Sequence, residues 1–444
     1  MDTQVQSSLI ERLFHLNENG TTVRREILAG LTTFASMAYI LFVNPQVLGD
    51  SGMNSGAVFT ATALSAILGS VLMGILANYP IAVAPGLGDN AFFSYSVVIA
   101  LGIPWQVAMS GVFVASLLFL LISVFKLREI VIDAIPHDLK LAVSAGIGMF
   151  ITFVGLKGGG LVVANKATLV EMGSLSVPTT WLTILGLLVT AVLMIRKVPG
   201  SIFIGMIVTT VTGLVTKLIP MPTHFVSGIP SLKPTFAESI FHLDKMIVEP
   251  KMWAVVIIFL LVSFFDTAGT LIGIAEQAGF IKDNKMPRIG RAMLADSISM
   301  VGGAVMGTTP TVAYVESSAG VAVGGRTGLT AISTGFFFAV AMFFSPILTM
   351  VTSNVTAPVL IIIGILMSQS LKYISWDKFE IALPAFLTIV AMPLTYNISY
   401  GIAFGFIFYP FTMIAAGRRK EVNLVMYLLL VVFAILMYVV NILS

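Results

Sequence analysis

The sequence predicts an all-α protein that crosses a membrane many times. Hydrophobic residues make up 57% of the 444 residues and charged residues only 10%, whereas a soluble domain carries roughly a quarter charged residues. The mean hydropathy of +1.00 is high for the whole chain, so one anchor on a soluble domain cannot account for it. Because a spanning helix needs about 20 apolar residues, this length leaves room for roughly 12 to 15 crossings.

Apolar stretches bounded by charged residues, Pro or Gly predict two series of seven crossings. A cytoplasmic segment, 1–26, precedes the first series, 27–218, and its residues 8–16 look amphipathic. The first series is expected at 27–43, 57–78, 81–100, 105–125, 138–156, 181–195 and 199–218. A Pro-rich extracellular connector, 219–251, separates it from the second series, 252–416. The second series is expected at 252–274, 289–306, 308–323, 328–350, 357–371, 379–395 and 397–416.

The basic residues support this segmentation and orient the chain. If the N-terminus is cytoplasmic, alternate loops place 18 of the 24 Lys and Arg residues inside and 6 outside. Such an excess is the positive-inside bias of membrane proteins. The C-terminal part, 417–444, then begins with a basic cytoplasmic loop and ends in a further apolar run, 422–443. The sequence leaves open whether that run is an additional span or an interfacial helix.

Seven crossings per half force the two halves into opposite orientations, which is the inverted-repeat plan of many secondary transporters. The third segment of each half is unlike its neighbours. Residues 80–93 and 307–320 are interrupted by Pro, Gly and polar residues at corresponding positions. Gly and Pro also occur in membrane helices for packing alone. Because both halves show the interruption at the same place, the sequence predicts two broken segments whose free backbone groups form a binding site.

Four carboxyl groups fall well inside the expected spans: Asp89, Asp266, Asp296 and Glu316. An ionised side chain at mid-bilayer costs about 2.5–3.5 kcal/mol even on the lenient insertion scale, so such residues face the protein interior. Burial favours the neutral form of a carboxyl group, which gives a route to proton coupling. For Asp296 a structural role is equally compatible with the sequence, and for Asp89 we expect a helix cap.

The surroundings of these carboxyl groups suit a planar heteroaromatic ligand. Asn90 offers both a donor and an acceptor, and Phe93 offers a flat surface beside it. The broken second segment brings backbone amides and the hydroxyls of Thr309 and Thr311. Most of the 31 Phe residues must face lipid or the core, so Phe93 alone is weak evidence.

Several kinds of protein are disfavoured by the sequence. With no Cys there is no thiolate nucleophile or Fe–S cluster, and the four His are scattered, so we expect neither a metal nor a cofactor. The glycine clusters at 158–160 and 324–328 lack the Lys-Ser/Thr of a phosphate-binding loop. Single carboxyl groups on unlike helices suit an occluded site better than a channel pore. We therefore expect a transporter that is not an enzyme and binds no nucleic acid.

Motifs in four regions resemble one known family. These are Thr-Thr-Phe-Ala-Ser-Met-Ala-Tyr-Ile at 32–40, Ala-Pro-Gly-Leu-Gly-Asp-Asn-Ala-Phe-Phe at 84–93, Phe-Asp-Thr-Ala-Gly-Thr at 265–270, and Tyr-Val-Glu-Ser-Ser-Ala-Gly at 314–320 with Gly-Gly-Arg-Thr-Gly-Leu-Thr at 324–330. The chain is similar in these motifs to the AzgA-like purine permeases of the nucleobase:cation symporter-2 family. It departs from the family at Asp89 and at Thr309-Pro310, which flank the expected site.

The resemblance implies two inverted seven-segment repeats in a uracil-transporter-like fold, with core and gate domains, commonly dimeric. It also implies proton-coupled import of adenine, guanine or hypoxanthine across the plasma membrane. The resemblance implies that Asp266, Glu316 and Asn90 bind the substrate and that Asp266 and Glu316 couple protons. From the residue pattern alone we add Phe93, Thr309 and Thr311 as substrate-binding residues and Asp296 as a proton-coupling residue. Sodium coupling, or transport of xanthine, uracil or an anion, stays the alternative, and the sequence does not select one purine.

Overall fold

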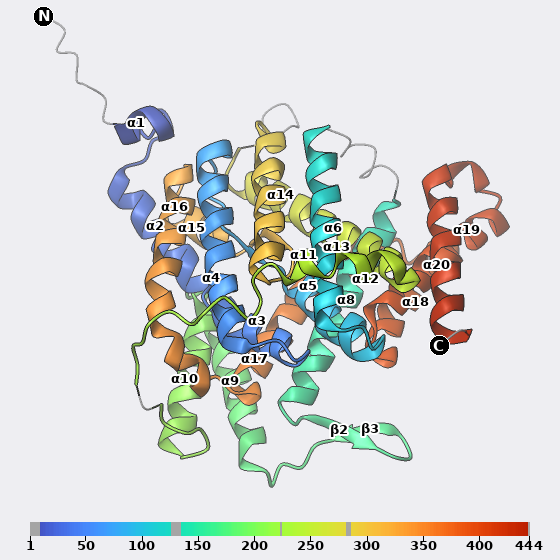
Figure 1. Ribbon diagram of the computed structural model, residues 1–444, viewed down its shortest axis with the longest axis horizontal. Helices are drawn as coiled ribbons and strands as arrows, with labels where there is room; N and C mark the ends of the chain where they lie inside the picture. The colour runs from blue at the N-terminus through green and yellow to red at the C-terminus, as the bar shows by residue number, and fades with distance from the viewer. Residues whose placement is uncertain (1–8, 126–134, 223, 281–285, 443–444) are drawn as a thin grey trace, which may run out of the picture.

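The computed structural model describes residues 9–125, 135–222, 224–280 and 286–442 and is mostly helical (Figure 1). Eight helices in these ranges are long and apolar enough to cross a membrane. The unbroken helices of the first half are α2 (Val23–Met37) with α3 (Ile40–Gly49), α4 (Ser55–Leu72) with η1 (Met73–Ala77), α6 (Trp105–Val124), α8 (His137–Gly158), α9 (Pro178–Ile195) and α10 (Ser201–Val215).

The second half repeats this plan. Its unbroken helices are α13 (Pro250–Gln277), α14 (Ile289–Met306), α16 (Gly328–Ala341) with η3 (Met342–Met350), α17 (Ser353–Met367) with η4 (Ser368–Tyr373), α18 (Phe379–Thr395) and α19 (Ile398–Ala415). Polar caps set several helix starts. Asn54 accepts a hydrogen bond from the Ala57 amide at the start of α4, and Asn397 accepts one from Ser399 at the start of α19, as the cap preference of Asn predicts.

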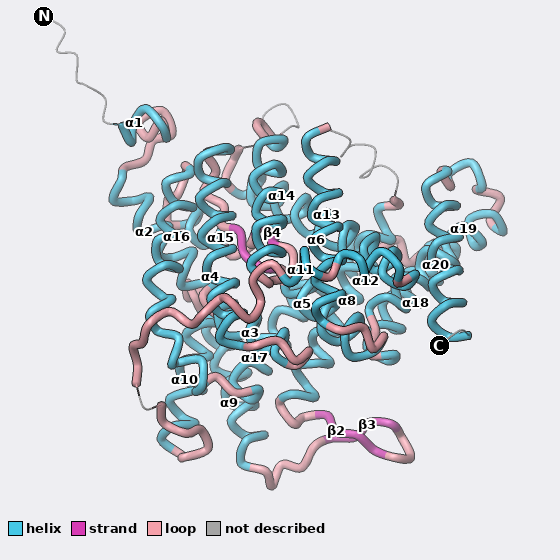
Figure 2. The backbone as a smooth tube through the Cα atoms, in the orientation of Figure 1, coloured by secondary structure: helices cyan, strands magenta, loops and turns pink. Residues whose placement is uncertain are grey.

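The third segment of each half is broken, as expected. In the first half, β1 (Val83–Pro85) leads into α5 (Leu87–Ala91) and η2 (Phe92–Ala100). In the second half, β4 (Thr311–Ala313) leads into α15 (Ser317–Ala322). The two strands pair antiparallel, and Figure 2 shows β4 enclosed among helices. This pairing satisfies backbone groups that lipid could not.

The helices form two packed groups, which confirms the expected core and gate arrangement. The core group contains α2, α4, α6, α13, α14 and α16, which pack on one another around the paired strands. The gate group contains α8, α9, α10, α17, α18 and α19. The groups meet where α3 contacts α17 and where α5 contacts α8. The broken segments therefore lie at the boundary between the core and gate groups.

The connector, 219–251, packs against one end of the core group. It carries the short helices α11 (Glu238–Phe241) and α12 (Leu243–Val248), both packed against α6. The Ala237 amide donates to the Val305 carbonyl at 2.7 Å, and the Thr60 hydroxyl donates to the Pro230 carbonyl at 2.9 Å. A hairpin of β2 (Val162–Asn165) and β3 (Leu169–Met172) follows α8 and projects at the bottom of the view in Figure 2.

A buried carboxyl group, Glu26, holds the start of α16. Its side chain accepts hydrogen bonds from the Thr327 and Thr330 hydroxyls, at 2.8 and 2.6 Å, and from the backbone amides of Arg326, Thr327 and Thr330. A Cβ at Gly328 would lie 2.0 Å from the Gly74 carbonyl oxygen, so only glycine fits there. The motif at 324–330 is thus a helix cap that joins α16 to α2.

We expect Glu26→Ala to destabilise the protein by about 3 kcal/mol or more, because it leaves buried donors without an acceptor. The measurement is the unfolding temperature of purified protein in detergent. The matched control is Glu18→Ala, which removes an exposed carboxylate beside His15 and should leave that temperature unchanged. An unaltered unfolding temperature in Glu26→Ala would show that the cap does not stabilise the fold.

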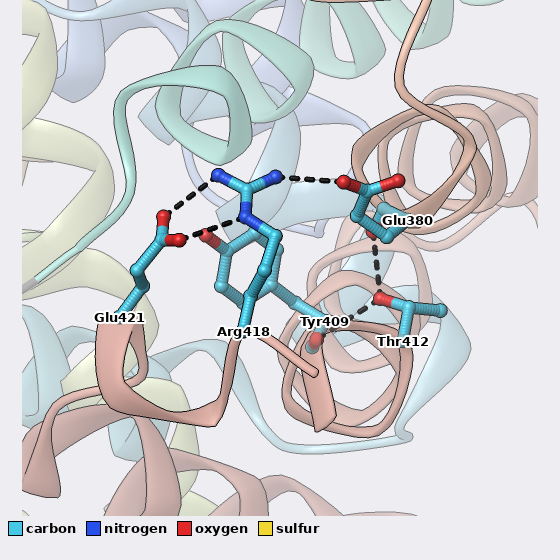
Figure 3. Close-up of polar contacts among 5 residues, drawn as sticks. All are labelled: Glu380, Tyr409, Thr412, Arg418 and Glu421. Atoms are coloured by element: carbon cyan, nitrogen blue, oxygen red, sulfur yellow. Dashed lines mark hydrogen bonds and ion pairs between the residues drawn. The ribbon is translucent and has the colours of Figure 1, made fainter. Parts of the chain in front are cut away.

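The apolar run expected at 422–443 forms α20 (Leu424–Ile442), which packs against α19 and α13. It therefore contacts both helix groups. The turn before it includes η5 (Arg419–Glu421) and is fixed by Arg418 (Figure 3). The Arg418 guanidinium donates to Glu380 at 2.7 Å and to both Glu421 oxygens at 2.8 and 2.7 Å. These hydrogen bonds lower the pKa of Glu421 and tie the turn to the start of α18.

Candidate functional site

A cavity of about 90 Å3 lies between the core and gate groups, beside the paired strands. We call it the central cavity. Its polar lining comes from Tyr39, Asp266, Thr270, Tyr314 and Glu316, all on core elements. The gate group contributes Ile363 and Met367 of α17. The two carboxyl groups that the sequence places first as site residues are thus brought to one cavity.

Glu316 immediately precedes α15 and points away from the helix it starts. It makes no side-chain capping bond to α15. Instead its Oε1 accepts a hydrogen bond of 2.5 Å from the hydroxyl of Tyr39. Tyr39 is 1% exposed and lies at the break between α2 and α3, so its ring is held firmly. This contact leaves the second Glu316 oxygen as an acceptor for a ligand.

Asp266 reaches the same cavity from the middle of α13. Among the described residues, no hydrogen-bond or ion-pair partner is found for its carboxyl group. Glu316 lines the same cavity. Thr270 lies one helical turn further along α13, on the same face. The arrangement therefore offers two acidic edges and a hydroxyl to one bound molecule.

Tyr314 forms part of the wall of the central cavity. Its hydroxyl donates to the Pro85 carbonyl at 2.6 Å, which fixes the ring against the first broken segment. Phe93, which the sequence offers as a flat surface beside Asn90, is fully buried in the hydrophobic core and does not line the cavity. The side chains of Phe264 and Phe265 lie outside the described part of the chain.

Asn90, Thr309 and Thr311 do not line the central cavity. The Thr309 hydroxyl donates to the Asn90 side-chain carbonyl, and Thr311 is the strand partner of Pro85. All three residues are fully buried. Within the described part of the chain, the Asn90 amide nitrogen and the Thr311 hydroxyl have no hydrogen-bond partner. The cluster joins the two broken segments and retains unused polar atoms.

The remaining intramembrane carboxyl groups contact α13 on either side of Asp266. Asp296 of α14 accepts a hydrogen bond of 2.7 Å from Thr267, and its other oxygen has no partner among the described residues. Asp89 accepts hydrogen bonds of 3.1 Å from Ser263. The expectation that Asp89 caps a half-helix is wrong. The N-cap residue of α5 is Gly86, which has no side chain to form a capping bond. Asp89 lies inside the helix, and its carboxyl group contacts Ser263 of α13.

Sequence reasoning gave no role to several residues of the central cavity, among them Tyr39, Thr270 and Met367. Tyr39 stands in a quoted motif but has no role assigned from the sequence. Thr270 could have been found by its spacing of four residues from Asp266. Met367 could not have been predicted, because the sequence does not distinguish the cavity-facing residues of the apolar helix α17 from its other apolar residues. In the described part of the chain no cluster of three or more His, Asp or Glu suits a metal ion.

The comparison with protein families decides what kind of protein this is. Residues 24–404 match the profile of a family described as the permease family. The chain belongs to this family. The match confirms the resemblance to the nucleobase:cation symporter-2 group, and it identifies a multi-pass membrane transporter rather than an enzyme.

Curated relatives cover nearly the whole permease. It is 54% identical over 433 residues to the guanine/hypoxanthine permease PbuG of Bacillus subtilis strain 168, covering 96% of this chain and 98% of the relative. It is 42% identical over 432 residues to the adenine permease AdeQ of Escherichia coli K12, covering 97% and 96%.

Solved structures show the same fold at low sequence identity. The transmembrane domain of the cyanobacterium bicarbonate transporter BicA matches with a TM-score of 0.61 and 14% identity, covering 86% of this chain and 97% of that one. The anion transporter family member SLC26A9 matches with a TM-score of 0.60 and 11% identity, covering 91% and 69%. These matches confirm the uracil-transporter-like architecture of the permease.

Proposed function

We propose that this permease imports purine nucleobases across the cell membrane together with protons, by alternating access. The observation that carries the proposal is the pair of carboxyl groups, Asp266 and Glu316, that face one cavity beside two broken segments. The guanine/hypoxanthine and adenine permeases among its relatives support purines as the substrate class. The proposed repeats are 27–218 and 252–416, joined by 219–251, and a homodimer stays a prediction.

The cavity chemistry suits the polar edge of a purine. The free oxygen of Glu316 accepts a ring N–H, and the Asp266 carboxyl group binds a second polar position. The ring lies against Tyr314, which the hydrogen bond to Pro85 holds in place. In this proposal the hydrogen bond between Asn90 and Thr309 holds the two broken segments together. The Asn90 amide nitrogen and the Thr311 hydroxyl are available to the substrate as further hydrogen-bonding groups. In this proposal Phe93 packs the helix that carries Asn90.

Proton coupling follows from the cost of charge in this environment. Two ionised carboxyl groups in one buried cavity repel each other, so binding of a neutral base is favoured when one carries a proton. Asp266 and Glu316 are the proposed carriers, and Asp296, which accepts a hydrogen bond from Thr267 next to Asp266 in the sequence, is a third. One proton moving down a unit pH gradient releases about 1.4 kcal/mol, and 100 mV adds about 2.3 kcal/mol. Together these drive several-hundred-fold accumulation of a base.

Alternating access follows from the position of the central cavity. It is lined by core residues on one side and by Ile363 and Met367 of the gate group on the other. A movement of the core group against α17 therefore opens or closes the cavity without rebuilding its polar side. The substrate travels with Asp266 and Glu316, while the gate group supplies the apolar barrier.

The test is uptake of labelled adenine, guanine, hypoxanthine, xanthine and uracil by cells that express the permease, at pH 5.5 and 7.5. We expect faster purine accumulation at pH 5.5, where the inward proton gradient is larger, and collapse of accumulation with a protonophore. Replacement of sodium by choline should have no effect. Failure of every purine to accumulate would contradict the proposed substrate, and dependence on sodium would contradict the proposed coupling ion.

A further inference from the structure

A second and larger cavity, of about 400 Å3, lies between the core and gate groups. We call it the vestibule. The residues of its lining that carry the argument are Gln46, Asp50, Tyr95, Lys157, Thr356 and Tyr396. Tyr39 lines the central cavity and Gln46 lines the vestibule. Because these residues are seven positions apart in a mainly helical segment, the two cavities are separated by about 10 Å along it. In the orientation that the Lys and Arg residues predict, the vestibule lies on the extracellular side of the central cavity.

Two opposite charges face the vestibule without forming an ion pair. Asp50 follows α3, and its Oδ2 accepts a hydrogen bond of 2.8 Å from the hydroxyl of Tyr95. Lys157 ends α8, and its ammonium lies 4.5 Å from the centre of the Tyr396 ring. Within the described part of the chain, no contact of 4.0 Å or less joins Asp50 and Lys157. Both groups therefore keep hydrogen-bonding capacity for a ligand.

Asp50 is an exposed residue, and the hydrogen bond from Tyr95 leaves lone pairs of its carboxylate open to solvent or to a ligand in the vestibule. Partial burial raises its pKa, and the Tyr95 hydroxyl and the Lys157 charge only partly offset that effect. A ligand that brought two further N–H groups would stabilise the ionised form. Lys157 is an exposed residue, so its ammonium can swing toward a ligand without disturbing the fold.

An aromatic cluster forms one wall of the vestibule. The Tyr95 and Tyr396 ring centres are 5.7 Å apart, and those of Phe150 and Tyr396 are 5.4 Å apart. Tyr396 occupies the left-handed turn between α18 and α19, with φ of 52°, and neighbouring rings hold it there. The Tyr95 and Tyr396 rings are inclined at 62° to each other, so this wall offers edge-to-face contact to a planar ring, beside a carboxylate and an ammonium that can meet donors and an acceptor on the edge of that ring.

We propose that the vestibule is a second, outer binding site for a 6-oxopurine, where Asp50 accepts the ring N–H and Lys157 donates to the 6-oxo group. In guanine the amino group adds a second donor to the same carboxylate, giving a bidentate contact. Adenine presents a ring acceptor and an amino donor in the reverse order, so the vestibule disfavours it. The choice of ligand class rests on the proposed function, whereas the site itself rests on the vestibule residues.

Hydrogen bonds at the vestibule also connect the core group to the gate group. Gln46 of the core group donates to Ser353 at 2.9 Å and accepts from Thr356 at 2.6 Å, both on α17 of the gate group. These bonds bridge the two groups at the vestibule. In this proposal a base bound in the vestibule moves on to the central cavity when the hydrogen bonds between Gln46 and α17 break.

The test is the number of hypoxanthine molecules bound per chain, measured by equilibrium dialysis of the detergent-solubilised permease at the lowest concentration that fills the wild type. At that concentration we expect about two in the wild type and closer to one in Asp50→Asn, in Lys157→Met and in Glu316→Gln, since each variant weakens one site. In cells, Asp50→Asn should raise the KM for hypoxanthine about tenfold, the loss for one charge-assisted hydrogen bond. The KM for adenine should change less than about twofold. Glu171→Gln, an exposed carboxylate of the β2–β3 hairpin, is the control.

The outcomes separate this site from the proposed function. One bound molecule in the wild type, or an unchanged hypoxanthine KM in Asp50→Asn, with purine uptake intact, overturns the vestibule site alone. No purine binding or uptake in the wild type overturns both proposals. If Asp50→Asn does not fold, Lys157→Met carries the same test, because its side chain is exposed.

Discussion

Glu316→Ala is expected to abolish purine binding while the permease still inserts into the membrane and folds. The change removes the acceptor of the Tyr39 hydroxyl and the proposed acceptor for the ring N–H of the base. Loss of one charge-assisted hydrogen bond plus one stranded buried donor corresponds to a decrease in affinity of about 100-fold or more. The measurement is equilibrium binding of labelled purine to the central cavity in Lys157→Met, where the vestibule site is already weakened.

Two controls separate recognition from folding. Glu316→Gln keeps the shape of the side chain and should fold as the wild type does, with binding reduced. Glu171→Ala removes a carboxylate outside both cavities and should bind normally. Near-normal uptake by Glu316→Ala at matched surface expression would show that the central cavity does not recognise the base through this residue.

Asp266→Asn is expected to lose uphill accumulation before it loses binding. The amide has nearly the shape of the carboxyl group and keeps a polar edge in the cavity, but it cannot take up and release a proton. The accumulation ratio should fall from several-hundred-fold to about one, the value for a carrier without proton coupling. Exchange of labelled for unlabelled base across the membrane should continue, and it is the measurement that shows binding is retained.

Neighbouring carboxyl groups serve as the comparison for Asp266. Asp89→Asn and Asp296→Asn alter buried groups that contact α13 at Ser263 and Thr267. If Asp266→Asn still accumulates base against a gradient, the coupled proton is carried elsewhere, and the variant of these two that loses accumulation identifies the carrier. Loss of accumulation in Asp266→Asn alone assigns the proton to the central cavity.

The fold was predictable because its signals are local. The expected segments at 289–306 and 379–395 coincide with α14 and α18, since charge and Pro mark their ends. The interruptions at 80–93 and 307–320 correspond to the two strand and short-helix segments. Hydropathy and turn chemistry act within a few residues of sequence, so they are readable without the tertiary structure.

The site was predictable only in part, because side-chain direction depends on distant contacts. Asp266 and Glu316 reach one cavity as the cost of intramembrane charge suggests. Phe93 points into the core, and Asn90 turns toward Thr309, which the sequence does not show. Asp89 follows a glycine pair and looks like a cap, yet the helix begins earlier and the carboxyl group meets Ser263 instead. Tyr39 becomes important only once the fold brings it to Glu316.

The most direct test of the central claim is proton movement driven by a purine gradient in proteoliposomes that contain a pH-sensitive dye. Addition of hypoxanthine or guanine outside wild-type vesicles should acidify the interior, and Asp266→Asn vesicles should take up base without acidification. Purine uptake by the wild type with no change of internal pH, unaffected by a protonophore, would contradict proton coupling through the central cavity.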